Sequence, residues 1–113
     1  MIPWLDDWHI KILNYLSKLG NDAGERIPFS HTTGSITVGI GYPYVEHVYK
    51  YTRNLGACGL LITRKGFVTS WPKEHPPIAP QQMKQLGHWI TPEGRTLVEA
   101  YRKVWPKELG VLP

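Results

Sequence analysis

Charged and polar side chains recur at helical spacing between residues 43 and 57. Lys50 and Arg53 are three positions apart, and Glu46 precedes Lys50 by four. At 100° per residue, these three side chains fall on one side of a helix. The opposite side would carry Val45, Val48, Thr52 and Leu55. His47, Tyr49 and Asn54 border the charged side, and Tyr44 lies on the flank of the apolar side.

These side-chain types match the hydrogen-bonding groups of duplex DNA. A helix fits the major groove, about 12 Å wide, where each base pair shows a distinct pattern of donors and acceptors. The lysine and arginine suit guanine or phosphate, and the histidine and asparagine suit either. Glu46 could accept from a cytosine amino group and would otherwise repel phosphate. The two tyrosines could donate to phosphate or pack against a thymine methyl group.

A second basic segment follows this helix in the sequence. Thr63-Arg64-Lys65-Gly66 reads as a turn between apolar strands at 60–62 and 67–71. Arg64 and Lys65 would then reach the flanking DNA backbone or the minor groove. With four to six phosphate contacts per protomer, the logarithm of DNA affinity should fall with log salt at a slope of roughly −4 to −5.

Further elements would position these two segments. Asp6 or Asp7 is expected to cap a helix over 7–19, and Thr91 a last helix that starts at Pro92. A short extended piece is expected at 26–29 and a short strand at 88–90. Residues 32–41 have poor helix propensity, and in isolation they indicate a strand or a loop. Prolines concentrated in 72–87 indicate a loop or an arm.

The order of these elements resembles that of winged helix–turn–helix proteins. Leu55-Gly56-Ala57-Cys58-Gly59-Leu60-Leu61 is similar to their junction after the recognition helix, and Ile90-Thr91-Pro92-Glu93-Gly94-Arg95-Thr96-Leu97 to the start of the helix after the wing. The resemblance spans about residues 7–104. It is strongest to small archaeal and viral repressor-type proteins and looser to MarR- and PadR-like regulators.

The resemblance implies an α+β fold with a three-helix core, a β-hairpin wing and a C-terminal helix. It also implies a second helix near 33–39, which propensity does not predict. Two wing layouts stay open. In one, Arg64-Lys65-Gly66 is the wing tip and an arm follows; in the other, all of 64–87 is one enlarged wing that pairs 60–63 with 88–90.

The function that the resemblance implies is sequence-specific binding of double-stranded DNA by a transcriptional regulator of the repressor type. Such regulators bind paired half-sites about 34 Å apart as two-fold dimers. A homodimer is therefore expected, built by the terminal helix and the N-terminal apolar residues. The candidate interface residues are Trp4, Leu97, Tyr101, Val104 and Trp105, joined by Ile2 and Leu5.

Length and charge agree with a small DNA-binding domain. The 113 residues suit one domain over 1–113, and the net charge is +4. In residues 26–73, Lys and Arg exceed Asp and Glu by five, which is the pattern of a segment that binds a polyanion. The sequence has a lone cysteine and no apolar run of about 20 residues, and its start is unlike a signal peptide. These features indicate a cytoplasmic protein without a membrane span.

No catalytic residues, metal ligands or cofactor motif emerge from the sequence. The five histidines are scattered, without Cys or carboxylate partners at ligand spacing. Cys58 is expected to be a small buried thiol at the junction between helix and strand, with a redox sensor as the alternative. The protein is therefore expected not to be an enzyme, and nothing identifies a small-molecule effector. Two other functions stay open: a protein-interaction winged helix, and a single-strand or replication-associated nucleic-acid binder that stacks bases on Trp and Tyr.

Overall fold

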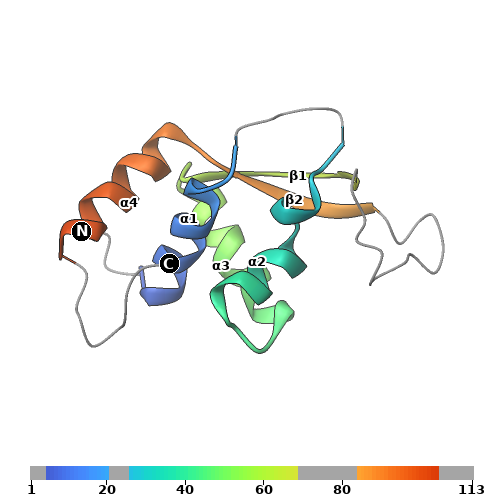
Figure 1. Cartoon of the computed structure of the whole chain (residues 1–113), viewed down its shortest axis with the longest axis horizontal. Coiled ribbons are helices and arrows are strands. Elements are labelled where there is room, and N and C mark those ends of the chain that lie inside the picture. Colours follow the sequence, from blue (N-terminus) through green and yellow to red (C-terminus); the bar gives the residue numbers. More distant parts are fainter. Residues whose placement is uncertain (1–4, 21–25, 69–83, 105–113) are drawn as a thin grey trace.

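A computed structural model describes residues 5–20, 26–68 and 84–104 of the chain. In the described residues, three α-helices precede a long β-hairpin and a fourth follows it, which is the order that the sequence predicts. The far end of the hairpin extends past the helices (Figure 1). The elements are α1 (Asp7–Ser17), a 3-10 turn η1 (Phe29–His31), α2 (Thr33–Ile40), α3 (Val45–Ala57), β1 (Leu61–Phe67), β2 (Lys84–Ile90) and α4 (Pro92–Val104).

Helix α1 begins with a reciprocal cap. The Asp6 carboxylate accepts from the amides of Trp8 and His9 at 2.9 and 3.2 Å, and the Asp6 amide donates to Nδ1 of His9 at 3.1 Å. This cap satisfies amides that have no partner inside the helix. The predicted start is confirmed, and the helix ends at Ser17, two residues before the predicted 19.

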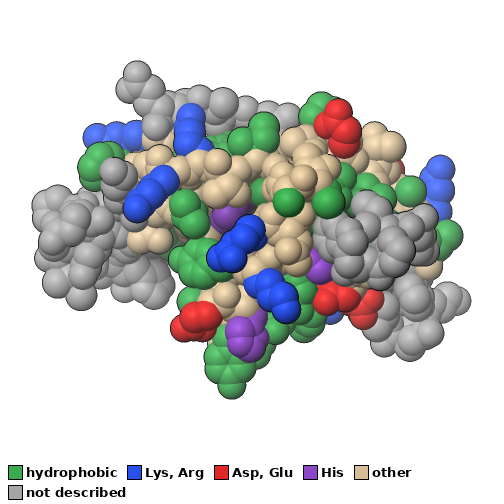
Figure 2. Space-filling model, turned by 180° about the vertical axis from the view of Figure 1, so that it is seen from behind, with side chains coloured by type: hydrophobic (Ala, Val, Ile, Leu, Met, Phe, Trp, Pro, Cys, Tyr) green, Lys and Arg blue, Asp and Glu red, His purple; other side chains and the backbone are tan. Residues whose placement is uncertain are grey.

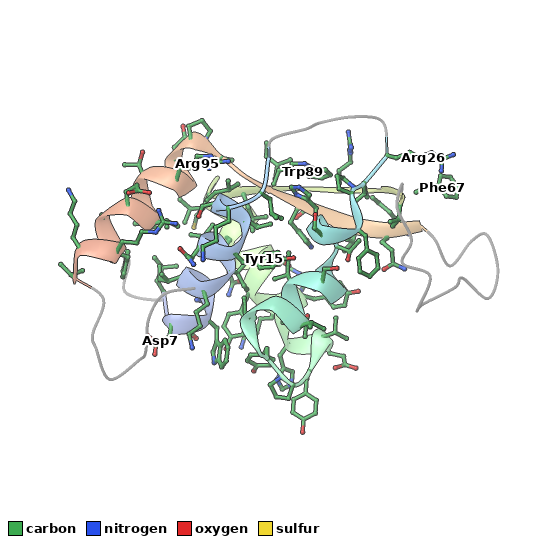
Figure 3. The ribbon with its side chains drawn as sticks, in the orientation of Figure 1. Asp7, Tyr15, Arg26, Phe67, Trp89 and Arg95 are labelled. Carbon is green, nitrogen blue, oxygen red and sulfur yellow. The ribbon has the colours of Figure 1, made fainter. Side chains whose placement is uncertain are left out.

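Helix α2 lies where the resemblance places it, at Thr33–Ile40, although its composition disfavours a helix. The Thr32 hydroxyl caps its first turn by accepting from the Ser35 amide, and Gly41 ends it at φ 75°. Gly39 faces the Tyr15 ring, which leaves no room for a side chain. Tyr15 lies between α1 and α2 in Figure 3. Close packing on α1 therefore stabilises a helix that propensity alone would not.

The hydrophobic core joins the three helices α1, α2 and α3 to the base of the hairpin and to α4. Its members are side chains with at most 8% exposure. Burial of this contiguous apolar surface is the main favourable contribution to folding. The core residues are Ile12, Leu13, Leu16, Ile36, Ile40, Val48, Leu55, Leu60, Leu61, Ile90 and Val98.

The wing is the enlarged form of the two layouts. β1 pairs with β2 in antiparallel register from Leu61 opposite Ile90 to Phe67 opposite Lys84. The expected turn at 63–66 is therefore wrong, because these residues lie inside β1. The expected returning strand at 67–71 is also wrong in its start, since Phe67 ends β1, and residues 69–71 lie outside the described part. Most of the proline-rich segment, 72–83, also lies outside it.

Helix α4 packs on α1 through two arginines. Thr91 caps α4, as predicted, because its hydroxyl accepts from the Gly94 amide at 3.1 Å. Arg95 donates to the Ser17 carbonyl at 2.9 Å, and Arg102 donates to Oδ1 of the buried Asn14 at 2.8 Å. The Arg95 bond satisfies a backbone carbonyl at the end of α1, and the Arg102 bond satisfies the side-chain amide oxygen of Asn14. Across the described ranges, no helix has the length and apolar character needed to cross a membrane.

Candidate nucleic-acid interface

Helix α3 buries one side and exposes the other, as its periodicity predicts. Val48, Thr52 and Leu55 are buried, and Val45 is half-buried. On the opposite side the charged residues and one bordering histidine are exposed, while two bordering residues are half-buried. The exposed residues are Glu46, His47, Lys50 and Arg53, and the half-buried ones are Tyr49 and Asn54.

Basic side chains gather on the face that α3 and the hairpin share. Figure 2 shows this face, which is on the side opposite to the view of Figure 1, with Lys and Arg side chains spread from the hairpin across α3. Lys50, Arg53 and Lys65 are all exposed. No described acidic side chain forms an ion pair with these three within 4 Å. A surface of this kind attracts a polyanion and loses that attraction as salt rises.

Aromatic rings pack together around the start of α3. Tyr44, 57% exposed, stands before the first turn, and its ring centroid is 5.3 Å from that of His47. The Tyr42 hydroxyl lies 3.0 Å from Nδ1 of His47. Tyr42 also packs edge-to-face on Trp8 at 4.6 Å and on Tyr51 at 5.9 Å. The position of Tyr44 is therefore linked through His47 to the helical core.

The two basic wing residues point to opposite faces of the hairpin, because neighbouring residues on a strand alternate. Arg64 is half-buried, and its guanidinium carbon lies 4.8 Å from the Trp89 ring centroid. The Trp89 ring in turn stacks on His31 at 5.1 Å. Lys65 shares its face with Thr63, which lies beside α3. The two residues predicted for DNA contact are thus in different environments, and Lys65 is the one on the α3 side.

An open pocket of about 500 Å³ separates α3 from the hairpin. Its α3 wall includes Tyr49 and Arg53, and its hairpin wall includes Thr63 and His88. Arg53 and the hydroxyl groups give this pocket donors for an anion or a phosphodiester. The remaining lining residues are Thr52, Gly56, Leu61, Ile62 and Leu86.

Two groups near this surface have strongly shifted pKa values. Burial, together with the neighbouring His31, lowers the pKa of His88 to about 4. Burial, with Asp6 and Tyr42 nearby, raises the pKa of Tyr51 to about 12. Both side chains are therefore neutral at pH 7. His88 is not among the site residues predicted from the sequence, although its alternation with Leu86 and Ile90 along a strand indicates the inner face.

The residues predicted for a dimer interface are only partly described. Leu97 is half-buried against the core, Tyr101 is half-buried, and Val104 is 62% exposed near the end of α4. Trp4 and Trp105 lie outside the described residues, as does Ile2. The apolar residues of α4 therefore divide between the core of this chain and its surface.

The described residues contain no group of three or more His, Cys, Asp or Glu side chains that could hold a metal ion. Cys58 is exposed at the end of α3. The expectation that it is buried is wrong: Cys58 follows the last residue of α3 as its C-cap, where its side chain is exposed.

No family model matches the sequence, and no curated protein matches it. Among solved structures, the chain is similar to a point mutant of S. aureus MepR, with a TM-score of 0.59 and 19% sequence identity. The match covers 93% of this chain and 61% of the MepR chain. The protein therefore has the α+β fold of a MarR-like winged helix, as the resemblance in the sequence predicts.

Proposed function

We propose that this protein binds double-stranded DNA sequence-specifically and acts as a transcriptional regulator of the repressor type. The observation that carries the proposal is the exposed side of α3, where Lys50 and Arg53 stand opposite the buried Val48, beside a hairpin with an exposed Lys65. A helix with this division of side chains can enter the major groove while its apolar side stays in the core.

The fold supports the same function. The match to MepR covers 93% of this chain, and DNA-binding regulators of this fold use a helix to read the major groove and the wing to hold the backbone. In this proposal α3 reads base edges through Glu46, His47 and Asn54, while the wing contacts phosphates. The protein acts in the cytoplasm as a homodimer, and it forms one domain over residues 1–113.

Selection from a random duplex library tests the proposal. The wild type should enrich a two-fold consensus, and the variant Lys50→Ala/Arg53→Ala should lose it. Lys18→Ala/Lys103→Ala removes the same charge from exposed positions just after α1 and on α4 and should keep the consensus. Equal binding by the first variant and the wild type would overturn the site. The proposed function would be overturned if the chain bound no DNA but captured another protein in a salt-insensitive way. It would also be overturned if the chain bound single-stranded DNA more tightly than duplex DNA.

A further inference from the structure

His88 is a fully buried histidine at the base of the wing, and both of its ring nitrogens have partners on other elements. Nδ1 lies 2.8 Å from the hydroxyl of Thr63 on β1, and Nε2 lies 2.7 Å from the hydroxyl of Thr33 on α2. A neutral imidazole donates at one nitrogen and accepts at the other, and a threonine hydroxyl does either. One tautomer therefore satisfies both contacts.

The backbone of β2 is held to the segment before α2 as well. Nδ1 of His31 lies 2.8 Å from the His88 carbonyl oxygen, which only accepts, so His31 carries its proton on Nδ1. Thr32 forms an isolated bridge with Gly87. A side chain at Gly87 would collide with Ile27. Residues 27–33 therefore fix the base of the hairpin by polar contacts and close packing.

On the other side, the base of the hairpin packs into the core, where Leu61 of β1 lies with Leu55 of α3. Farther along the hairpin, the open pocket of about 500 Å³ lies between α3 and the strands, and the chain passes from α3 to β1 through Gly59 at φ 73°. Because the connection is short and the pocket is open, contacts with other elements must set the angle between the wing and α3. The contacts from His88 to α2 are placed to set it, because a buried polar group is costly unless its hydrogen bonds are made.

We propose that His88 is a positioning residue of the DNA interface, which through Thr33 and Thr63 holds the wing at one angle to α2 and α3. Lys65 then stays at a fixed separation from Lys50 and Arg53, so that helix and wing contact the same duplex together. The second half of this inference rests on the proposed function, whereas the first half concerns the free protein.

The free protein tests the first half. Nitroxide labels at Val38→Cys on α2 and Phe67→Cys on β1, both exposed, would be introduced in a Cys58→Ser background. The distance distribution between the labels should be narrow in this background and about twofold wider with Thr33→Val, which removes the hydroxyl but keeps the shape.

Two further variants of α2 serve as matched comparisons. Thr33→Ser keeps the hydroxyl and should restore the narrow distribution. Thr37→Val removes a buried hydroxyl that bonds within α2, to the Thr33 carbonyl at 2.7 Å, and should leave the distribution narrow. An unchanged distribution in Thr33→Val, or an equal broadening in Thr37→Val, would overturn the positioning role whether or not the protein binds DNA.

Duplex binding tests the second half. Thr33→Val should bind the consensus duplex from the library about tenfold more weakly than the wild type. The slope of its log affinity against log salt should decrease in magnitude by about one, which corresponds to the loss of one phosphate contact. Thr33→Ser should restore both values. If the wild type binds duplex and the broadened variant keeps its affinity and slope, the wing angle does not serve the interface. If the wild type binds no duplex, the proposed function fails, while the label distances still decide how the wing is held.

Discussion

Gly94 and Leu60 approach so closely that only a glycine fits at the start of α4. A Cβ atom at Gly94 would overlap the carbonyl oxygen of Leu60 and lie 2.7 Å from Cγ1 of Ile90. The Leu60 oxygen also accepts from the Thr91 amide at 3.2 Å, which fixes its position. The glycine in the motif at the start of this helix therefore has a packing role.

Gly94→Ala should destabilise the protein by about 1–3 kcal/mol, because the atom it meets is backbone that cannot rotate away. Gly34→Ala is the matched control, since this exposed glycine in α2 has no atom within 4 Å of its Cβ position. It should be neutral or stabilise by up to about 1 kcal/mol. Urea unfolding measures both changes, and equal midpoints for the two variants would contradict the prediction.

The buried His88 predicts a loss of stability in acid. Its pKa is lowered from 6.5 to about 4 by burial, so the unfolded chain takes up a proton below pH 6.5 while the folded chain stays neutral. The free energy of unfolding should therefore decrease as the pH falls from 6.5 to about 4, by on the order of 3 kcal/mol in total. Above pH 6.5 this contribution is constant.

Urea unfolding of the wild type and of His88→Gln across this pH range measures that contribution. The variant should be less stable at pH 7 and should show a shallower decrease toward pH 4. Parallel pH dependences of the two proteins would show that His88 does not cause the acid sensitivity.

The salt dependence of DNA binding should report individual contacts of α3. The wild type should show a slope of roughly −4 to −5 per protomer, and Lys50→Ala should reduce its magnitude by about 0.9, the value for one lost phosphate contact. Lys18→Ala removes an exposed lysine at the end of α1 and should leave the slope unchanged. Fluorescence anisotropy of a labelled duplex at several salt concentrations measures these slopes, and a common slope for all three proteins would contradict the α3 assignment.

Light scattering at tens of micromolar protein should show a homodimer. Val104→Glu places a charge on the exposed apolar side of α4 and should shift the dimer toward monomer, because burying an unpaired carboxylate is costly. Val38→Glu is the control: Val38 lies on α2 and is 82% exposed, compared with 62% for Val104. This variant should leave the dimer intact. A monomeric wild type would contradict the prediction.

The sequence predicts those parts of the fold whose pattern is local. The burial of Val48, Thr52 and Leu55 follows from the period of α3, and the caps Asp6 and Thr91 follow from residue type and position. The existence of α2 followed from resemblance, because its glycines lower helix propensity. One of them, Gly39, serves the approach of Tyr15 from another helix, which a single sequence does not reveal.

The sequence leaves two layouts of the wing open for a related reason. Lys65 and Gly66 are turn-like in isolation, yet they pair with Leu86 and Gln85 across a segment of nearly twenty residues. Such pairing depends on contacts distant in sequence, and the local pattern indicates only the base of the second strand, at 88–90. The opposite orientations of Arg64 and Lys65 follow from this strand and could not follow from a turn.

The bond from Arg95 to the Ser17 carbonyl joins residues 78 positions apart. During translation, the first helix therefore leaves the ribosome long before the side chain that completes its C-terminal end has been made. Contacts of such high sequence separation form late and slow the folding of small proteins. Until α4 is synthesised, the nascent chain has an incomplete core with exposed apolar surface, and this is the stage at which a chaperone would have most to bind.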